Sequence, residues 1–171
     1  MSEYVVGVDE VGRGSLVGSA IVCAFRSQNS FFQALPFDVS DSKKINKKKR
    51  EEIYNYFKLN KGFNYNYQII VGKKKFIEKF NIHNVVLQCM KQSIILLSKK
   101  TDTVIIDGKF IPNGMEDYKV KALVKADDKI NQVSAASIIA KVYRDKLITK
   151  LHLKDNVYQW NKNAGYGTKN H

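Results

Sequence analysis

The chain has 171 residues, 44% of them apolar, which suits one domain with a sizeable buried core and excludes a disordered tail. Its 29 Lys and Arg residues outnumber its 16 Asp and Glu residues, and the formal charge of +13 favours polyanionic partners, nucleic acid before an anionic membrane surface. Cys23 and Cys89, both in apolar stretches, form neither a disulfide framework nor a zinc pattern. Without a long apolar span or a signal-peptide pattern, we expect a soluble cytoplasmic protein with no membrane partner.

The N-terminal part predicts two strands joined by a glycine-rich turn. Residues 4–8 form a short, β-branched apolar run, as expected of a buried strand. Residues 16–25 form a second such run, close enough to the first to pair with it antiparallel. Residues 27–40 mix polar and aromatic side chains around a proline, which indicates a loop.

The middle of the chain predicts two helices and a strand. Asn46 is a candidate N-cap for a helix over residues 47–57. Alternating apolar and polar residues over 64–71 indicate a strand, whereas residues 73–81 fit either a short helix or a charged turn. Helical periodicity predicts a central helix over 82–97.

The C-terminal part repeats the pattern of a strand ending in an acid. Residues 103–107 read as a buried strand, residues 118–124 as another strand, and residues 132–151 as a long helix. The sequence of the tail from Asp155 does not clearly predict a helix or a strand. Because no linker divides the chain, we expect a single α/β domain over residues 1–171.

Two adjacent carboxylates, Asp9 and Glu10, stand between the first strand and the turn Gly12-Arg13-Gly14. A buried charge needs a partner, so two acids at a strand end indicate a nearby cation. Side chains alternate across a strand, so both acids reach one ion cluster only if the strand bends or each serves from a different side. Glycines flanking Arg13 let the backbone approach a phosphate or sugar. The alternative is a polar strand end followed by a tight turn.

Asp107 and Asp127 complete a set of four acids that follow strand-like runs. If the strands lie side by side, their ends converge at one edge of a sheet. Clustered carboxylates raise one another's pKa unless a cation intervenes, and oxygen ligands favour Mg²⁺ or Mn²⁺ over zinc. Two such ions can activate a water and stabilise the leaving oxygen of a phosphodiester, so we expect metal-assisted hydrolysis of nucleic acid. Surface caps and salt-bridge partners are the alternative role.

The long C-terminal helix carries a polar and cationic stripe. Its members at helical spacing are Ser134, Ser137, Lys141 and Arg144. The stripe either borders a nucleic-acid groove or faces solvent. The lysine-rich run over residues 47–50 is better interpreted as a solvated helix face, and the lone His83 as structural.

Six short motifs occur in order along the chain, at residues 7–14, 41–44, 106–108, 125–127, 134–145 and 165–168. Together they resemble the successive motifs of type 2 ribonuclease H, ribonuclease HII, and they cover nearly the whole chain. One motif alone would be weak evidence, but six in the family's order are highly specific. The Gly-Arg-Gly form favours this type over its sister, ribonuclease HIII.

The resemblance implies a ribonuclease H-like fold, a mixed, mainly five-stranded sheet flanked by helices. It implies endonucleolytic cleavage of RNA in RNA/DNA hybrids and at single ribonucleotides in duplex DNA, with a role in ribonucleotide excision during replication and repair. The cut falls on the 5′ side of the ribonucleotide and leaves 3′-hydroxyl and 5′-phosphate ends. The implied cofactors are two Mg²⁺ or Mn²⁺ ions. We expect a monomer without an obligate protein partner.

The resemblance also implies roles for single residues. The family's four metal-binding acids correspond to Asp9, Glu10, Asp107 and Asp127. The turn that senses the ribose 2′-hydroxyl, the group that separates RNA from DNA, corresponds to Gly12, Arg13 and Gly14. The tyrosine that packs on the neighbouring sugar corresponds to Tyr166. Further candidate substrate contacts are Lys43 and Lys44 near the scissile phosphate, either of which could make the contact, and Ser137, Lys141 and Arg144.

Three features depart from the family's pattern. Ser15 and Ser19 stand where the family often has prolines, so we expect a less rigid turn. A second acid, Asp128, directly follows Asp127. We assign the ligand role to Asp127 because it comes directly after Lys125-Ala126, as in the family's motif. The chain ends at His171, so we expect it to lack the usual C-terminal extension and to bind duplexes more weakly.

Two other functions compete with this interpretation. One is a nucleic-acid-binding module without catalysis, against which the presence of all four acids argues. The other is a related nuclease that acts on DNA alone, such as a junction resolvase. A duplex with one ribonucleotide, compared with an all-DNA duplex, separates the second from a ribonuclease H.

Overall fold

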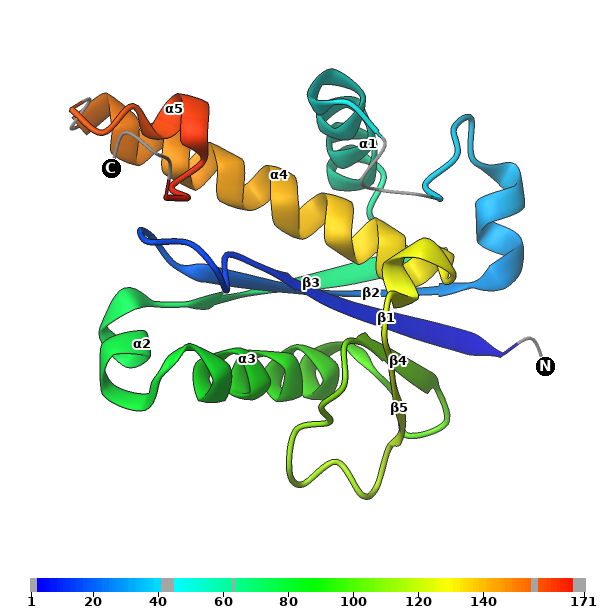
Figure 1. Cartoon of the computed structure of the whole chain (residues 1–171). Helices are drawn as coiled ribbons and strands as arrows, with labels where there is room; N and C mark the ends of the chain where they lie inside the picture. The colour runs from blue at the N-terminus through cyan, green and yellow to red at the C-terminus, as the bar shows by residue number, and fades with distance from the viewer. Residues whose placement is uncertain (1–2, 41–44, 63, 155–156, 168–171) are drawn as a thin grey trace.

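A computed structural model describes residues 3–40, 45–62, 64–154 and 157–167 of the chain. The strands are β1 (Tyr4–Val11), β2 (Ala20–Gln28), β3 (Tyr65–Gly72), β4 (Thr103–Asp107) and β5 (Lys119–Leu123). The helices are α1 (Lys47–Leu59), α2 (Lys74–Phe80), α3 (Ile82–Leu97), α4 (Asn131–Lys154) and α5 (Trp160–Asn163), with 3-10 turns η1 (Asn29–Ala34) and η2 (Ala126–Asp128). The sheet is the middle of three layers, with α1, α4 and α5 over one face and α2 and α3 under the other (Figure 1).

The sheet has the order β3-β2-β1-β4-β5, with β1, β2 and β3 antiparallel and β1, β4 and β5 parallel. The mixed five-stranded sheet and the antiparallel first pair are therefore confirmed. Two predicted boundaries beside the turn were wrong. β1 continues to Val11 and β2 begins at Ala20, because residues 9–11 go on pairing with residues 21–23. Asp9 and Glu10 thus lie within a paired strand, and the turn occupies residues 12–19.

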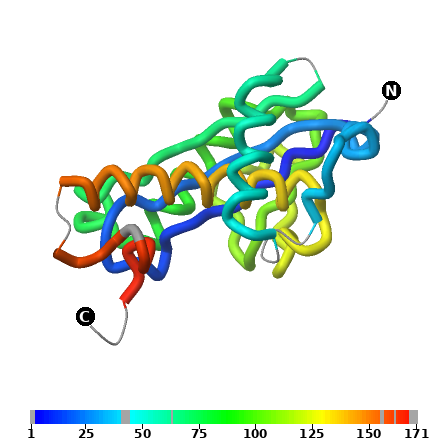
Figure 2. The backbone as a smooth tube through the Cα atoms, turned by 90° about the horizontal axis from the view of Figure 1, so that it is seen from above, coloured from blue at the N-terminus to red at the C-terminus, as the bar shows by residue number. Residues whose placement is uncertain are grey.

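Each face of the sheet buries its own apolar cluster because side chains alternate along a strand. On the α4 face, the ring of Phe25 packs against Phe57 and Tyr65, with centroids 5.0 and 5.4 Å away. On the α3 face, Val6 of β1 packs in one cluster with Met90 of α3. Seen from above, α4 runs along the sheet and α1 lies crosswise to it (Figure 2).

The start of α4 almost touches the middle of β1. A Cβ atom at Gly7 would stand 2.2 Å from the main-chain carbon of Gln132 and 2.2 Å from the main-chain nitrogen of Val133. Only a residue without a side chain permits such an approach. The absence of a side chain at Gly7 therefore sets how closely α4, and the η2 turn before it, approach the part of β1 that carries Asp9.

The structure settles several local predictions about single helices and loops. The side chain of Asn46 accepts a hydrogen bond from the Lys49 main-chain N–H at 2.9 Å, which confirms the N-cap of α1. The ambiguous stretch over residues 73–81 contains the helix α2. The predicted loop over residues 27–40 instead begins with the end of β2 and the turn η1. Among the helices described, none has the length and apolar character of a transmembrane span.

A partly buried ion pair lies toward the other end of β1 from Asp9. Arg26 donates from Nε and Nη2 to the carboxylate of Asp102 at 2.7 and 3.0 Å, a two-pronged contact that fixes the guanidinium plane. The same guanidinium lies 3.9 Å from the centre of the Tyr4 ring. This pair joins β2 to the segment that leads into β4.

Candidate active site

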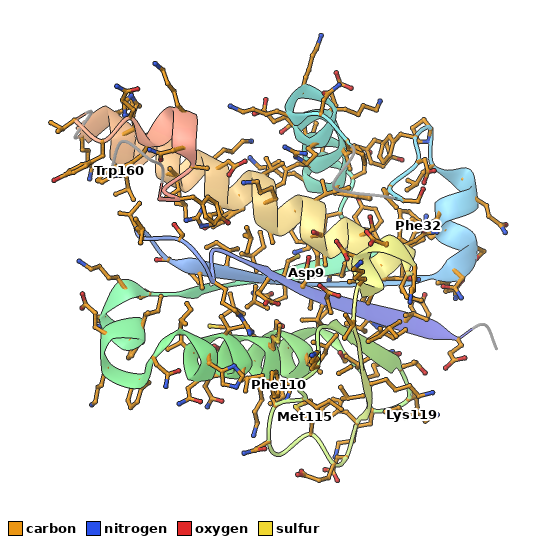
Figure 3. The ribbon with its side chains drawn as sticks, in the orientation of Figure 1. Asp9, Phe32, Phe110, Met115, Lys119 and Trp160 are labelled. Atoms are coloured by element: carbon orange, nitrogen blue, oxygen red, sulfur yellow. The ribbon has the colours of Figure 1, made fainter. Side chains whose placement is uncertain are left out.

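Asp9 lies near the middle of the molecule, where β1 passes beneath the first turns of α4 (Figure 3). Its side chain is buried and hydrogen-bonds the Ser137 side chain of α4. Its Oδ1 also accepts the main-chain N–H of Glu10 at 2.7 Å. Both donors favour the ionised carboxylate and hold it in one orientation.

Glu10 forms an ion pair with Arg13 at the start of the turn. Its Oε1 lies 3.1 Å from the Arg13 Nε, and the Arg13 side chain is 38% exposed. The guanidinium therefore brings positive charge to the acid from the solvent side.

Asp107 ends β4 at the level of Asp9. Val8 pairs with Ile106 in the parallel ladder of β1 and β4, so the two aspartates occupy the next position on each strand. The Oδ1 of Asp107 accepts the main-chain N–H of Ala126 at 2.8 Å, which ties the η2 turn to the end of β4.

The two acids of the η2 turn, Asp127 and Asp128, differ in how deeply they are buried. Lys125 enters the turn with a φ of 57°, in the left-handed region. Asp127 is 3% exposed, whereas Asp128 is exposed. Asp127 is therefore the inward-facing acid of the two, and its role as a metal ligand stays a prediction.

The acids disturb one another's ionisation. Burial is the main cause that raises the pKa of Asp9 well above its ordinary value; the Ser137 hydrogen bond lowers it, and the charges of Glu10 and Asp107 raise it. The pKa of Glu10 is raised first by burial, lowered by Arg13 and raised again by Asp107. Asp9, Glu10 and Asp107 therefore form one patch of concentrated negative charge, which a bound cation would relieve.

Carboxylate oxygens are the ligands that Mg²⁺ and Mn²⁺ prefer, so the chemistry of this patch fits a hard divalent ion. Within the described ranges, no three acidic, histidine or cysteine side chains are already arranged around a common ion position. Asp9 and Asp107 are held by main-chain N–H groups, and Glu10 is held by Arg13. Ligation of an ion would exchange part of these contacts for metal–oxygen bonds.

The turn after β1 combines a packed glycine with an open one. Gly12 has a φ of 99°, and a Cβ atom there would stand 2.6 Å from the Nε of Arg144 and 3.1 Å from the carbonyl oxygen of Ser19. Gly14 is exposed, and a Cβ atom there would meet nothing within 4 Å. The tip of the turn is thus bare backbone that a ligand can approach, on a closely packed base.

We expect Gly12→Ala to lower the free energy of unfolding by about 1–3 kcal/mol, because the positive φ and the contact with Arg144 both oppose a side chain. Gly14→Ala is the matched control and should keep the parental stability. Urea unfolding of both variants checks this. Equal losses, or none at Gly12, would contradict the packing described for the turn.

The predicted stripe on α4 is divided between the site and the interior. Ser137 faces the acids, and Lys141 is half-buried, with Nζ 2.9 Å from the Oδ1 of Asp145 and 5.9 Å from the centre of the Tyr166 ring. Arg144 is only 1% exposed and lies 5.3 Å from the same ring. It therefore does not occupy the open, groove-lining position that the helical spacing suggested. The predicted contacts Lys43 and Lys44 fall outside the described residues.

Two residues that matter for the site were not singled out from the sequence. Gly7 carried a usable signal, since an isolated glycine in a β-branched run indicates close backbone approach. Ser15 was noted only as a departure expected to loosen the turn. Its Oγ lies 2.5 Å from Nη2 of Arg144 and 2.7 Å from the carbonyl oxygen of Gly165, contacts between positions remote in the chain.

The sequence comparisons with known proteins support one family. The sequence model of Ribonuclease HII matches residues 6–171. The Ribonuclease HII of Pelagibacter ubique (strain HTCC1062) is 46% identical over 169 residues, which cover 99% of this chain and 87% of that protein.

Solved structures show the same architecture. The RNase HII in the PCNA:RNase HII complex from Archaeoglobus fulgidus aligns with a TM-score of 0.78 at 26% identity, over 96% of this chain and 81% of that one. Bst-RNase HIII in complex with Mn²⁺ aligns with a TM-score of 0.72 at 21% identity, over 90% of this chain and 55% of that one. The expected ribonuclease H-like fold is thus confirmed. With a family match from β1 to the C-terminus and a relative aligned over nearly all of this chain, the chain belongs to the ribonuclease HII family and is a ribonuclease H, an enzyme class that acts on RNA/DNA hybrids.

Proposed function

We propose that the protein is a divalent-metal-dependent endonuclease that cuts RNA in RNA/DNA hybrids and duplex DNA at embedded ribonucleotides. The cut falls on the 5′ side of the ribonucleotide and leaves 3′-hydroxyl and 5′-phosphate ends. One observation carries the proposal: within the patch formed by Asp9, Glu10 and Asp107, Glu10 is paired with Arg13, the residue directly before the open backbone at Gly14. A charge cluster for phosphodiester chemistry thus adjoins a surface that can approach one sugar.

The residues that would hold two Mg²⁺ or Mn²⁺ ions are Asp9, Glu10, Asp107 and Asp127. When bound, the ions supply the positive charge that activates a water and stabilises the leaving oxygen. The chain's own contribution is orientation. Ser137 and the Glu10 N–H fix Asp9, and the Ala126 N–H fixes Asp107. Arg13 limits the repulsion that Glu10 experiences from its acidic neighbours.

The substrate side of the proposal concerns the turn and the C-terminal segment. The backbone of Gly12, Arg13 and Gly14 would sense the ribose 2′-hydroxyl, which a DNA nucleotide lacks. The Tyr166 ring, with Lys141 and Arg144 beside it, would pack on the neighbouring sugar. Lys43 or Lys44 is proposed to contact the scissile phosphate. The formal charge of +13 favours retention of a duplex polyanion.

The proposal is tested with three labelled duplexes: an RNA/DNA hybrid, DNA with one ribonucleotide, and the same DNA without it. We expect Mg²⁺- or Mn²⁺-dependent cleavage of the first two, none of the third, and none of any after chelation with EDTA. Mapping of the ends should place the cut 5′ of the ribonucleotide.

Each other outcome would overturn a different part of the proposal. Equal cutting of the all-DNA duplex would remove the ribose-sensing role of the turn and favour a DNA nuclease. Full activity in EDTA would remove the metal role of the acids. Binding to all three duplexes without cleavage would leave only a nucleic-acid-binding module. Light scattering in the same buffer tests the predicted monomer.

A further inference from the structure

Two segments proposed to contact the substrate meet at one buried guanidinium. Arg144 donates from Nη1 to the carbonyl oxygen of Ala164 at 2.8 Å, and from Nη2 to Ser15 Oγ at 2.5 Å and the Val17 carbonyl at 3.1 Å. Ala164 lies two residues before Tyr166, and Ser15 directly follows Gly14. One side chain of α4 therefore holds the ribose-sensing turn and the tyrosine segment, although they lie about 150 positions apart.

The Ser15 hydroxyl closes the link between the two segments. It accepts from Arg144, and its single proton is shared between the carbonyl oxygens of Gly165, at 2.7 Å, and Val17, at 2.9 Å. The next main-chain N–H, that of Leu16, donates to the same Gly165 carbonyl at 3.0 Å. The turn and the tyrosine segment thus share hydrogen bonds directly as well as through Arg144.

Close packing leaves little freedom for these contacts to shift. A Cβ atom at Gly165, whose φ is 78°, would stand 2.6 Å from Val17 Cγ1 and 3.1 Å from Ser15 Oγ. On the other side, the Arg144 side chain fills the space beneath Gly12. Burial of a guanidinium is costly unless fixed acceptors compensate for lost water, and here the acceptors of Nη1 and Nη2 belong to the two substrate-facing segments. The Nε has no partner among the residues that the structure describes.

We infer that Ser15 and Arg144 form a clamp that sets the position of the Gly12-Arg13-Gly14 turn relative to Tyr166, so both are positioning residues for recognition of the ribose and its neighbour. The inference rests on the proposed function of those two segments. It also reverses the expectation that serine at position 15 loosens the turn, because the hydroxyl provides a restraint of its own.

The test compares Ser15→Ala, Arg144→Met and Arg144→Lys with two controls. Ser93→Ala removes a buried hydroxyl that donates to the Met90 carbonyl within α3, and Arg26→Met removes a half-buried, paired guanidinium near the other end of β1. Melting temperature, KM and kcat are measured on the single-ribonucleotide duplex, and hydrogen exchange is followed in the free proteins.

Loss of a hydrogen bond to a charged group corresponds to about a tenfold effect, so Ser15→Ala and Arg144→Met should each raise KM about tenfold with a smaller change in kcat. The double variant Ser15→Ala/Arg144→Met should have a KM close to that of Arg144→Met alone, because both substitutions disrupt the same hydrogen-bond network. Arg144→Lys should recover part of the affinity. Amide exchange should accelerate in residues 12–17 and 164–167 together. The controls should lower melting temperature and leave KM at the parental value.

Two results would overturn the clamp. One is a parental KM in Ser15→Ala and both Arg144 variants. The other is exchange that accelerates in only one of the two segments. The exchange readout needs no substrate, so it distinguishes failure of the clamp from failure of the proposed function, which would show as a parental enzyme that does not cut at ribonucleotides. Ser15→Ala loses one oxygen atom from a half-buried side chain and keeps the test informative if Arg144→Met does not fold.

Discussion

Replacement of Asp9 by Asn should reduce metal-dependent cleavage by on the order of a thousandfold or more, while duplex binding is largely retained. The amide keeps the volume of the carboxylate and can still accept the Glu10 N–H. It loses the negative charge that strengthens the binding of a divalent ion. Single-turnover cleavage and equilibrium binding, measured on the same single-ribonucleotide duplex, separate the two effects. A cleavage rate near the parental one would remove Asp9 from the metal site.

The same substitution should stabilise the metal-free protein near neutral pH. Burial and the neighbouring acids raise the pKa of Asp9 above that of the unfolded chain. Between those two values the folded state binds more protons than the unfolded state, so stability falls as pH rises through this window. The amide of Asp9→Asn does not titrate, so the melting temperature of this variant should exceed the parental one by an amount that grows across the window and then levels off.

With divalent ions present, the parent should have a higher melting temperature than Asp9→Asn. An ion that binds only the folded state raises the melting temperature by mass action. Mg²⁺ or Mn²⁺ should therefore stabilise the parent and have little effect on Asp9→Asn. Asp117→Asn is the matched control, since it removes an exposed aspartate whose partner is Lys100. Equal ion-induced shifts in the parent and Asp9→Asn would indicate that the ions bind elsewhere.

Much of this fold could be predicted because helix periodicity and helix capping depend on residues that are close together in the sequence. The helix over 82–97 has the observed bounds, and Asn46 caps α1 as predicted, since periodicity and capping act within a few residues of chain. Asp9, Glu10 and Asp107 were singled out because a carboxylate at the end of a buried apolar run needs a partner. The strand boundaries at Val11 and Ala20 were missed because pairing between β1 and β2, not composition, decides where those strands stop.

The role of Arg144 could not be predicted from helical spacing. Spacing places it on the stripe of Ser137 and Lys141, but burial depends on what covers that part of the helix. The covering residues are Ser15, Val17 and Ala164, which come from two distant segments. Contacts between such segments leave no period in a single sequence, so only the folded chain distinguishes a solvent-facing arginine from a buried one.

The second large effect is expected from Gly7→Ala, although it adds only one methyl group. The methyl would stand 2.2 Å from main-chain atoms of Gln132 and Val133. Main chain cannot rotate aside as a side chain can, so β1 and the start of α4 must separate. Overpacking of a well-packed core costs about 1–3 kcal/mol and occasionally more, and we expect at least the upper part of that range here. Urea unfolding measures the loss, with Gly14→Ala as the alanine control in open space.

Gly7→Ala should also impair catalysis in molecules that remain folded, because the separation moves one side of the site against the other. Asp9 is carried by β1, whereas Ser137 lies on α4 and Asp127 in the turn before it. A shift of even a fraction of an ångström weakens the Ser137 contact and changes the distance between the acids, and catalytic rate is sensitive to displacements of that size. The rate per folded molecule should therefore fall at saturating substrate, and higher Mg²⁺ should restore part of it by filling a weakened site. A destabilised variant with the parental rate would mean that the acids do not depend on the approach of α4 to β1.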